Sequence, residues 1–316
     1  MRIVVIDGHT LNPGDLNWNA LNSFGEVINY DRTLLEHITE RCRNAEIILT
    51  NKVPLSAATI EAAKDLKLIC VTATGYNIVD IEAASKRRIP VCNVPNYGTS
   101  SVAQHTFALI LELANRAGLN SAAVRQGEWE KSPDFCFSKG RITELQGKTL
   151  GIIGFGKIGI QVAKLATAFD MRVIYYSQTK KETNLATYAN MEDVFSQCDI
   201  LSLHCPLTRS NNQFVNRSLL SKMKKTAWII NTSRGQLIHE GDLANALNSD
   251  QLEAAAVDVL SVEPPSVTNP LLRAKNCLVT PHTAWMSLEA RRRILGVTVQ
   301  NIDCYLKGKP QNLVAL

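Results

Sequence analysis

Three side chains suited to the reduction of a keto acid each follow a short apolar run in the second half of the chain: Arg234, Glu263 and His282. An arginine offers two parallel hydrogen bonds to a carboxylate, and a histidine can give a proton to a carbonyl oxygen near neutral pH. A carboxylate beside that histidine would favour its protonated form and fix its orientation. Each residue alone has a simpler interpretation as a surface arginine, a turn-capping glutamate or a structural histidine. Their joint occurrence is what indicates catalysis.

A glycine-rich turn, Gly154-Phe155-Gly156-Lys157-Ile158-Gly159, follows an apolar run and precedes an amphipathic stretch. Dinucleotide-binding turns require this strand–turn–helix context. Gly154 would permit the tight turn, Gly156 the approach of a pyrophosphate to the helix N-terminus, and Gly159 the close packing of helix on strand. The sequence therefore predicts a nicotinamide dinucleotide site, in preference to a glycine-rich turn without a ligand.

The next strand should end about 20 residues after the glycine turn, where an acid commonly binds the adenosine ribose of NAD. At this point the sequence has Ser177, followed by Lys180 and Lys181. A carboxylate would repel the 2′-phosphate of NADP, whereas serine and lysine can accept it. The expected cofactor is therefore NAD or NADP, and the sequence leaves the preference between them open.

Short apolar runs alternate with amphipathic stretches, the pattern of parallel sheets with crossover helices. In the first half we expect strands near 2–7, 26–30, 46–50, 67–72 and 90–93, and helices near 15–23, 31–43, 56–64 and 79–87. In the second half we expect six strands, near 149–153, 172–176, 199–203, 227–231, 254–258 and 277–279. Ligands bind at the C-terminal ends of such strands, so the three side chains and the glycine turn should converge there.

Two long helical patterns mark the boundaries between the units. One starts after Gly98 and is expected to be capped by Ser100 or Ser101, and its His105 is interpreted as an ordinary packed or exposed helix residue. The other, near 287–306, is expected to fold back onto the first unit. We therefore expect one domain from 1–98 plus 286–316 and a second from 99–285.

Composition excludes several classes of protein. The 316 residues are 45% hydrophobic and 20% charged, as in folded globular proteins, and the net charge of +5 is spread along the chain. Arg291-Arg292-Arg293 is interpreted as a solvated helix face, so no nucleic-acid partner is expected. The eight cysteines lack metal-site spacing and fit a reducing compartment. With neither a signal peptide nor a membrane-spanning run expected, the predicted location is cytoplasmic.

Further motifs make the sequence resemble a known family: His204-Cys205-Pro206-Leu207-Thr208, Asn231-Thr232-Ser233-Arg234-Gly235 and Pro281-His282-Thr283-Ala284-Trp285. Together with the glycine turn they are similar to the D-isomer-specific 2-hydroxyacid dehydrogenases over essentially the whole chain. The resemblance implies an α/β protein of two doubly wound parallel-sheet domains, a Rossmann NAD(P)-binding domain inserted into a flavodoxin-like substrate-binding domain. It also implies a homodimer joined through the cofactor domains, with the helix near 100–115 as the candidate interface.

The resemblance also assigns roles to particular residues. It implies that Arg234 anchors the substrate, that Glu263 pairs with the histidine, and that His282 is the acid/base. Thr74-Gly75 looks like the family's carboxylate-binding turn, and Lys52 is expected near the substrate. The cofactor contacts expected from the resemblance are Gly154, Gly156, Lys157, Ile158, Gly159, Ser177, Cys205, Pro206, Thr232, Ser233, Arg234, Asp258, His282 and Ala284. Ser177 departs from the family pattern, because NAD-preferring members usually carry Asp there.

Within this family the segments 51–77 and 282–285 look closest to the glycerate dehydrogenase/hydroxypyruvate reductase branch. The expected reaction is therefore hydride transfer between NAD(P)H and hydroxypyruvate, giving D-glycerate. Two alternatives stay open. One is a D-2-hydroxyacid dehydrogenase for glyoxylate or another 2-keto acid, and the other is a dinucleotide-sensing, corepressor-like binding protein on the same scaffold.

Overall fold

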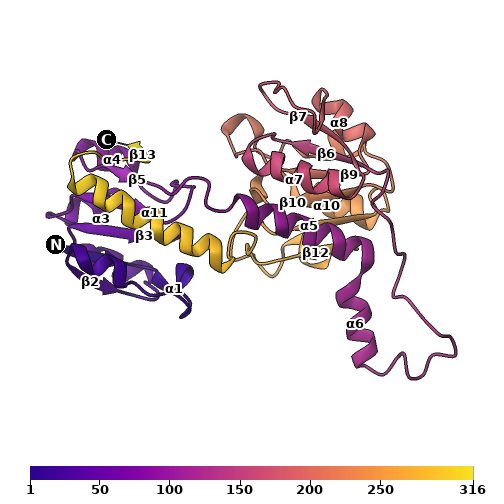
Figure 1. The fold of residues 1–316 in the computed structure, drawn as a ribbon, viewed down its shortest axis with the longest axis horizontal. Helices are drawn as coiled ribbons and strands as arrows, with labels where there is room; N and C mark the ends of the chain where they lie inside the picture. The colour runs from indigo at the N-terminus through magenta and orange to yellow at the C-terminus, as the bar shows by residue number, and fades with distance from the viewer. Residues whose placement is uncertain (316) are drawn as a thin grey trace. The chain divides into compact units, whose positions relative to one another are not determined.

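The computed structural model describes residues 1–315, and these form two compact α/β units. One unit combines residues 1–98 with 286–315, and the other is the continuous segment 99–285 (Figure 1). The chain therefore leaves the first unit once, builds the second, and returns to complete the first. Within residues 1–315, no helix is long and apolar enough to cross a bilayer.

The first unit contains one six-stranded sheet in the order β13-β5-β4-β3-β1-β2. Five strands are parallel, as predicted: β1 (Arg2–Val5), β2 (Glu26–Asn29), β3 (Ile47–Thr50), β4 (Leu68–Val71) and β5 (Val91–Cys92). The sixth, β13 (Leu313–Ala315), pairs antiparallel with β5 and was not predicted. Strands β3 and β4 are buried throughout, as expected for parallel strands covered on both faces.

The helices of the first unit are short except for the last. They are α1 (Gly8–Leu11), α2 (Ile38–Cys42), α3 (Ala57–Ala62), α4 (Ile81–Lys86) and α11 (Leu288–Leu306), with 3₁₀ turns at Asn19–Phe24 and Leu35–His37. The helix predicted near 15–23 is wrong. The Asn12 side chain instead accepts hydrogen bonds from the backbone of Gly14 and Leu16, which closes a local turn before the 3₁₀ segment.

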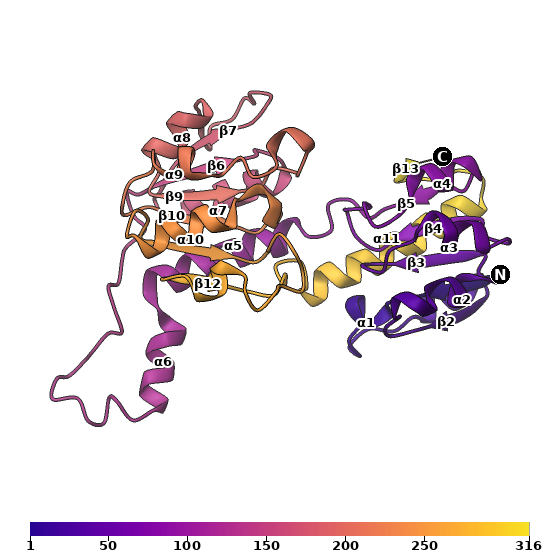
Figure 2. The same cartoon turned by 180° about the vertical axis from the view of Figure 1, so that it is seen from behind.

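Helix α11 packs against β4 of the first sheet, and both views show it running alongside that sheet (Figures 1 and 2). Its Arg291 is only 6% exposed and makes a two-pronged ion pair with Asp15, with N–O distances of 2.5 and 2.6 Å. Hydrogen bonding from Arg291 lowers the pKa of the Asp15 carboxyl below its usual value. The interpretation of this residue as part of a solvated face is therefore wrong, whereas Arg292 and Arg293 are exposed.

The second unit contains one parallel sheet of seven strands in the order β12-β11-β10-β9-β6-β7-β8. The strands are β6 (Thr149–Ile153), β7 (Arg172–Tyr176), β8 (Thr187–Tyr188), β9 (Ile200–Leu203), β10 (Trp228–Asn231), β11 (Ala254–Val257) and β12 (Cys277–Val279). Six of them match the predicted strands, and β8 is a short addition at the edge. Because every pairing is parallel, the C-terminal ends of these strands all lie along one edge.

The helices of this unit are α5 (Thr99–Asn115), α6 (Ala117–Arg125), α7 (Lys157–Ala168), α8 (Met191–Gln197), α9 (Arg217–Leu220) and α10 (Glu240–Asn248), with 3₁₀ turns at Arg209–Asn211, Gly235–Leu237 and Pro270–Arg273. Helix α5 begins at Thr99, so Ser100 and Ser101 lie in its first turn and do not precede it as caps. The Ser101 hydroxyl instead donates to the carbonyl of Ala284 at 2.7 Å.

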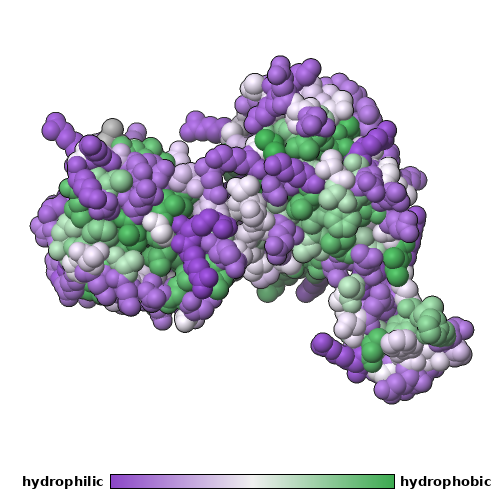
Figure 3. Space-filling view, in the orientation of Figure 1, coloured by the Kyte–Doolittle hydropathy of each residue, from purple (hydrophilic) through white to green (hydrophobic). Residues whose placement is uncertain are grey.

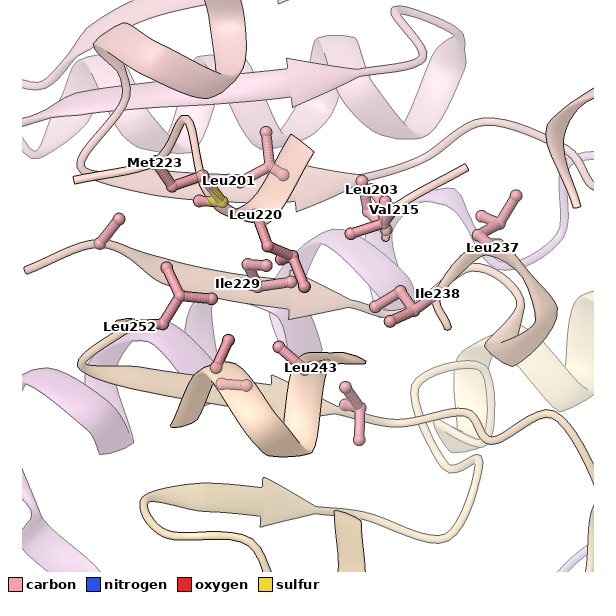
Figure 4. Close-up of a cluster of buried hydrophobic side chains, with 14 of the residues drawn as sticks. Leu201, Leu203, Val215, Leu220, Met223, Ile229, Leu237, Ile238, Leu243 and Leu252 are labelled. Atoms are coloured by element: carbon pink, nitrogen blue, oxygen red, sulfur yellow. The ribbon is translucent and has the colours of Figure 1, made fainter. Parts of the chain in front are cut away.

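Alternate residues of each strand enter separate cores on the two faces of the second sheet. Leu201 and Ile229 pack with Leu243 of α10 in one cluster (Figure 4). Ile200 and Trp228 belong to the other cluster, with side chains of α5 and α7. Close packing on both faces fixes the positions of the strand ends, and these ends carry the candidate functional residues.

Candidate active site

Six of the predicted site residues follow strands of the second sheet at its C-terminal edge. They are Gly154 after β6, Ser177 after β7, Cys205 after β9, Thr232 after β10, Asp258 after β11 and His282 after β12. In open α/β sheets ligands bind outside this edge, near the point where the strand order reverses. Here the order reverses between β6 and β9, where the glycine turn lies.

The three glycines of the turn meet different requirements. Gly154 has φ +99°, and a Cβ there would lie 2.4 Å from the backbone nitrogen of Cys205. At Gly159 a Cβ would lie 2.3 Å from the carbonyl oxygen of Gly154, so a side chain would separate α7 from the turn. At Gly156, the N-cap of α7, a Cβ would meet nothing within 4 Å. The turn thus leaves open space at the positive end of a helix, as a pyrophosphate requires.

The turn after β7 presents hydroxyl and backbone groups at the strand end where an acid commonly binds the ribose of NAD. The Ser177 hydroxyl donates to the carbonyl of Thr179 at 2.7 Å. The ammonium of Lys180 lies 5.9 Å from the ring centre of Tyr188, and the backbone of Lys181 bonds to the hydroxyl of Tyr175. Residues 177–181 contain no acid that would repel a 2′-phosphate, and the first acid after β7 is Glu182.

His282 and Glu263 form a short pair. Nδ1 of His282 lies 2.6 Å from Oε2 of Glu263, and the other carboxylate oxygen accepts the backbone N–H of Leu260 at 2.9 Å. The His282 backbone is left-handed, with φ +56°, and its N–H donates to the carbonyl of Asp258. The side chains of His282 and Glu263 are 26% and 36% exposed, so the pair is accessible to solvent. The hydrogen bonds with the backbone of Leu260 and Asp258 hold its geometry.

Asp258 fixes the loop on either side of the histidine. Its carboxylate is buried and accepts the Thr280 hydroxyl at 2.6 Å, the Thr283 N–H at 2.9 Å and the Ala284 N–H at 2.8 Å. Burial alone would raise the pKa of this carboxyl, but hydrogen bonds, first among them one from His105, bring that pKa below its usual value. Asp258 is therefore an anion that holds the backbone around His282.

Arg234 lies on a turn that is stabilised by hydrogen bonds of the nearby Asn231 side chain. The Asn231 side chain donates to the carbonyl of Arg234 at 2.9 Å and accepts the N–H of Ser233 at 3.0 Å. The arginine side chain is exposed, with Nη1 donating to the carbonyl of Ser233. A Cβ at Gly235 would lie 1.9 Å from the carbonyl carbon of Leu260, so the arginine loop lies directly against the loop that carries the glutamate.

The remaining predicted contacts lie around the same edge. The Ser233 hydroxyl donates to the carbonyl of Cys205 at 2.6 Å, and Thr232 bonds to Thr106 of α5. Burial raises the pKa of the Cys205 thiol to about 11, which keeps it protonated near neutral pH. The other predicted contacts are Lys157 and Ile158 in the first turn of α7, exposed Pro206, and buried Ala284. Residues 1–315 contain no cluster of three His, Cys, Asp or Glu placed to hold a metal ion.

His105 is the residue that sequence interpretation missed. From α5 its Nε2 lies 3.3 Å from Oδ1 of Asp258 and 3.2 Å from the hydroxyl oxygen of Thr280. The interpretation of His105 as a packed or exposed helix residue agrees with its half-buried position on α5, but it did not include these two hydrogen-bonding partners. No local spacing signals this contact, because Thr280 is 175 positions away.

In the first unit, two further predicted residues follow adjacent strands. Lys52 comes after β3, where the buried carboxylate of Asp7 accepts the successive N–H groups of 51, 52 and 53. Burial raises the pKa of Asp7, although these N–H groups oppose the rise. Thr74 comes after β4, and its hydroxyl donates to the carbonyl of Val94 at 2.8 Å. Both loops lie at the C-terminal edge of the first sheet, since β3 and β4 are parallel neighbours.

Comparison with known proteins gives a consistent result. Residues 107–284 match the family described as D-isomer specific 2-hydroxyacid dehydrogenase, NAD binding domain. The chain is 44% identical to a hydroxypyruvate reductase of Blautia hydrogenotrophica, over 99% of both chains, and 37% identical to a glycerate dehydrogenase of Methylorubrum extorquens, over 99% of this chain and 98% of the other. A glyoxylate reductase of Aeropyrum pernix is 36% identical over 88% of this chain and 85% of its own length.

Solved structures agree over the full length of the chain. A protein of Thermus thermophilus superimposes with a TM-score of 0.89 at 32% identity, covering all of both chains. An acyclic imino acid reductase in complex with NADPH and D-Arg superimposes with a TM-score of 0.86 at 30% identity, covering 99% of this chain and all of the other.

Proposed function

This chain belongs to the D-isomer-specific 2-hydroxyacid dehydrogenases, and on that premise we propose that it reduces hydroxypyruvate to D-glycerate with a nicotinamide cofactor. The observation that carries the proposal is the 2.6 Å pair of His282 and Glu263 at the same sheet edge as the glycine turn. A proton donor and a dinucleotide turn at one edge are the two parts that reduction of a carbonyl needs.

The residues of the second unit fit an NAD or NADP molecule. The open position at Gly156 and the N-terminus of α7 would hold the pyrophosphate, and Ser177 would face the adenosine ribose. Asp258 and the loop Thr232–Arg234 would lie on the nicotinamide side. The nicotinamide, when bound, supplies the hydride. We propose that six further residues also contact the cofactor: Lys157, Ile158, Gly159, Cys205, Pro206 and Ala284.

We assign the remaining steps to three side chains. Arg234 binds the substrate carboxylate and carbonyl by parallel hydrogen bonds, which sets the carbonyl carbon toward the hydride donor. Nδ1 of His282 is engaged by Glu263, so the proton passes to the substrate oxygen from Nε2. Glu263 stabilises the protonated ring before transfer and orients it throughout. In the oxidation direction His282 takes the hydroxyl proton back.

The two units take separate tasks in this proposal. The segment 99–285 binds the cofactor, and 1–98 with 286–316 is the proposed substrate-binding domain. Asp7 holds the backbone at Lys52, and the Asn93 side chain donates to the carbonyl of Thr74, so both loops are braced. Lys52 supplies a cation, and the N–H groups of the Thr74–Gly75 turn supply donors, for the substrate carboxylate.

The choice of substrate is supported by the relatives at 44% and 37% identity, which are named hydroxypyruvate reductase and glycerate dehydrogenase. Glyoxylate is the second candidate, because several further relatives are named glyoxylate reductase. A panel of hydroxypyruvate, glyoxylate, pyruvate and phenylpyruvate, each assayed with NADH and with NADPH, tests the proposal. We expect the highest kcat/KM for hydroxypyruvate and a D-configured product. A higher value for glyoxylate would reassign the substrate. Cofactor binding without turnover of any 2-keto acid would favour the corepressor-like alternative.

The proposal includes a homodimer in the cytoplasm. Helix α6 and the segment after it extend from the rest of the second unit (Figure 1), and this extension carries hydrophobic surface (Figure 3). Its exposed apolar side chains include Leu119, Trp129 and Phe135, the last 92% exposed. Exposed apolar groups that gather on one element mark contact surfaces. The proposed interface therefore extends from the expected helix, α5, into α6 and this segment. Light scattering should give a dimer mass, and Phe135→Asp should lower the measured mass.

The proposed cytoplasmic location rests on the cysteines. All eight are unpaired, which suits a reducing compartment.

A further inference from the structure

The buried carboxylate of Asp258 determines how the histidine loop is held. Its oxygens accept hydrogen bonds from residues on both sides of His282, namely Thr280, Thr283 and Ala284. The backbone carbonyl of Asp258 also accepts the N–H of His282 itself. A left-handed residue that is not glycine is held in its conformation by its surroundings, and here the carbonyl groups of Asp258 and Thr280 both accept the His282 N–H.

A buried carboxylate is costly unless its charge is compensated. Among the groups that donate to Asp258, His105 is the side chain able to carry a positive charge. Its Nε2 also lies 3.2 Å from the Thr280 oxygen, whose hydrogen is directed to Asp258 at 2.6 Å. Both oxygens facing Nε2 are therefore acceptors, so Nε2 carries a hydrogen and donates to the two of them.

We propose that His105 is a positioning residue for the reaction: by binding Asp258 and Thr280 it fixes the loop that sets the orientation of the His282 ring toward Glu263. The inference rests on the proposed function, in which His282 is the acid/base. His105 contributes from α5, an element that carries none of the three side chains assigned to the chemistry. Its removal should therefore weaken the chemical step while substrate capture by Arg234 is kept.

The test compares His105→Phe, which keeps a ring but loses the donor, with His105→Gln, which keeps a donor on a flexible side chain. One lost hydrogen bond to a charged group corresponds to about a 10- to 100-fold effect. We expect His105→Phe to lower kcat by that factor while KM for the keto acid stays within about threefold. His105→Gln should recover most of kcat. His37→Phe, at an exposed histidine of the first unit, is the matched control and should match the unaltered protein.

A second measurement does not depend on turnover. Hydrogen exchange of the amides of Thr283 and Ala284, which donate to Asp258, should be faster in His105→Phe than in the unaltered protein and His105→Gln. If His105→Phe does not fold, His105→Asn, whose amide is too short to reach Asp258, takes its place.

The outcomes separate the inference from the proposed function. Unchanged kcat and unchanged exchange in His105→Phe would overturn the inference, as would an equal loss in His105→Gln and His105→Phe. If the unaltered protein reduced no 2-keto acid, the proposed function would fail. The exchange experiment would then still show whether His105 holds the His282 loop.

Discussion

Nδ1 of His282 lies 2.6 Å from Oε2 of Glu263, and the second oxygen of that carboxylate is held by the backbone N–H of Leu260. The glutamate is thus fixed at one oxygen and directed at the histidine with the other. A carboxylate at this distance stabilises the imidazolium and holds one ring orientation. The two residues should therefore act as a unit in proton transfer.

The variant His282→Ala removes the proposed proton donor. Its kcat for keto-acid reduction should fall by about 10²–10⁴-fold, the usual contribution of a positioned acid or base. Steady-state assays with matched thermal unfolding measure this, and His37→Ala serves as the control. Turnover near that of the unaltered protein in a folded His282→Ala variant would remove His282 from the mechanism.

For Glu263→Gln we expect the pH profile of reduction to move to lower pH. The amide keeps the size of the side chain but removes the negative charge that favours the protonated ring, so the proton donor is lost at a lower pH than before. The measurement is kcat/KM for reduction across the pH range. Glu192→Gln, at an exposed glutamate on α8, should leave the profile in place. An unmoved profile in Glu263→Gln would show that the two residues are not coupled.

Replacement of Arg234 by lysine keeps the charge but loses the planar pair of donors. We expect kcat/KM for the keto acid to fall more than about tenfold, which corresponds to about 1.36 kcal/mol, because a misplaced carbonyl also misplaces the hydride acceptor. Arg292→Lys, at an exposed position of α11, is the control. A loss of less than about twofold would argue against Arg234 as the substrate anchor.

The turn after β7 predicts that NADPH is tolerated. Ser177→Asp should shift preference toward NADH, because the carboxylate repels a 2′-phosphate and binds the ribose hydroxyls. The ratio of kcat/KM for NADH to that for NADPH should rise at least about tenfold, a change of about 1.4 kcal/mol. Ser196→Asp on α8 adds the same charge elsewhere. An unchanged ratio, or hundredfold rejection of NADPH by the unaltered protein, would show that position 177 does not select the cofactor.

Alanine at two glycines of the turn should separate folding from cofactor binding. At Gly156 an added Cβ meets nothing within 4 Å, so Gly156→Ala should keep its Tm but raise the Kd for NADH at least about tenfold, about 1.4 kcal/mol. At Gly159 the added Cβ would lie 2.3 Å from a carbonyl oxygen, so Gly159→Ala should lower the Tm. Gly296→Ala, in open space on α11, should change neither. Unaltered NADH affinity in Gly156→Ala would place the pyrophosphate elsewhere.

Local patterns were sufficient for much of the fold, because a buried parallel strand is an apolar run and a crossover helix is amphipathic. They failed where the determining contact is distant in sequence. Arg291 resembles any exposed arginine until Asp15, 276 positions away, is placed beside it. The same holds for His105 and Thr280. Strand β13 is three residues long and was missed because it depends on β5 for its pairing.

The first unit is assembled from both ends of the chain, and this affects its synthesis. Strands β1 to β5 leave the ribosome first, but α11 and β13, which complete their sheet, follow only after residues 99–285. At the usual rates of translation that delay lasts roughly 10–40 s. During it the growing polypeptide exposes one side of β4 and the edge of β5, while the continuous second unit can fold as it emerges. Aggregation on the ribosome, and dependence on chaperones, should therefore arise from the N-terminal sheet.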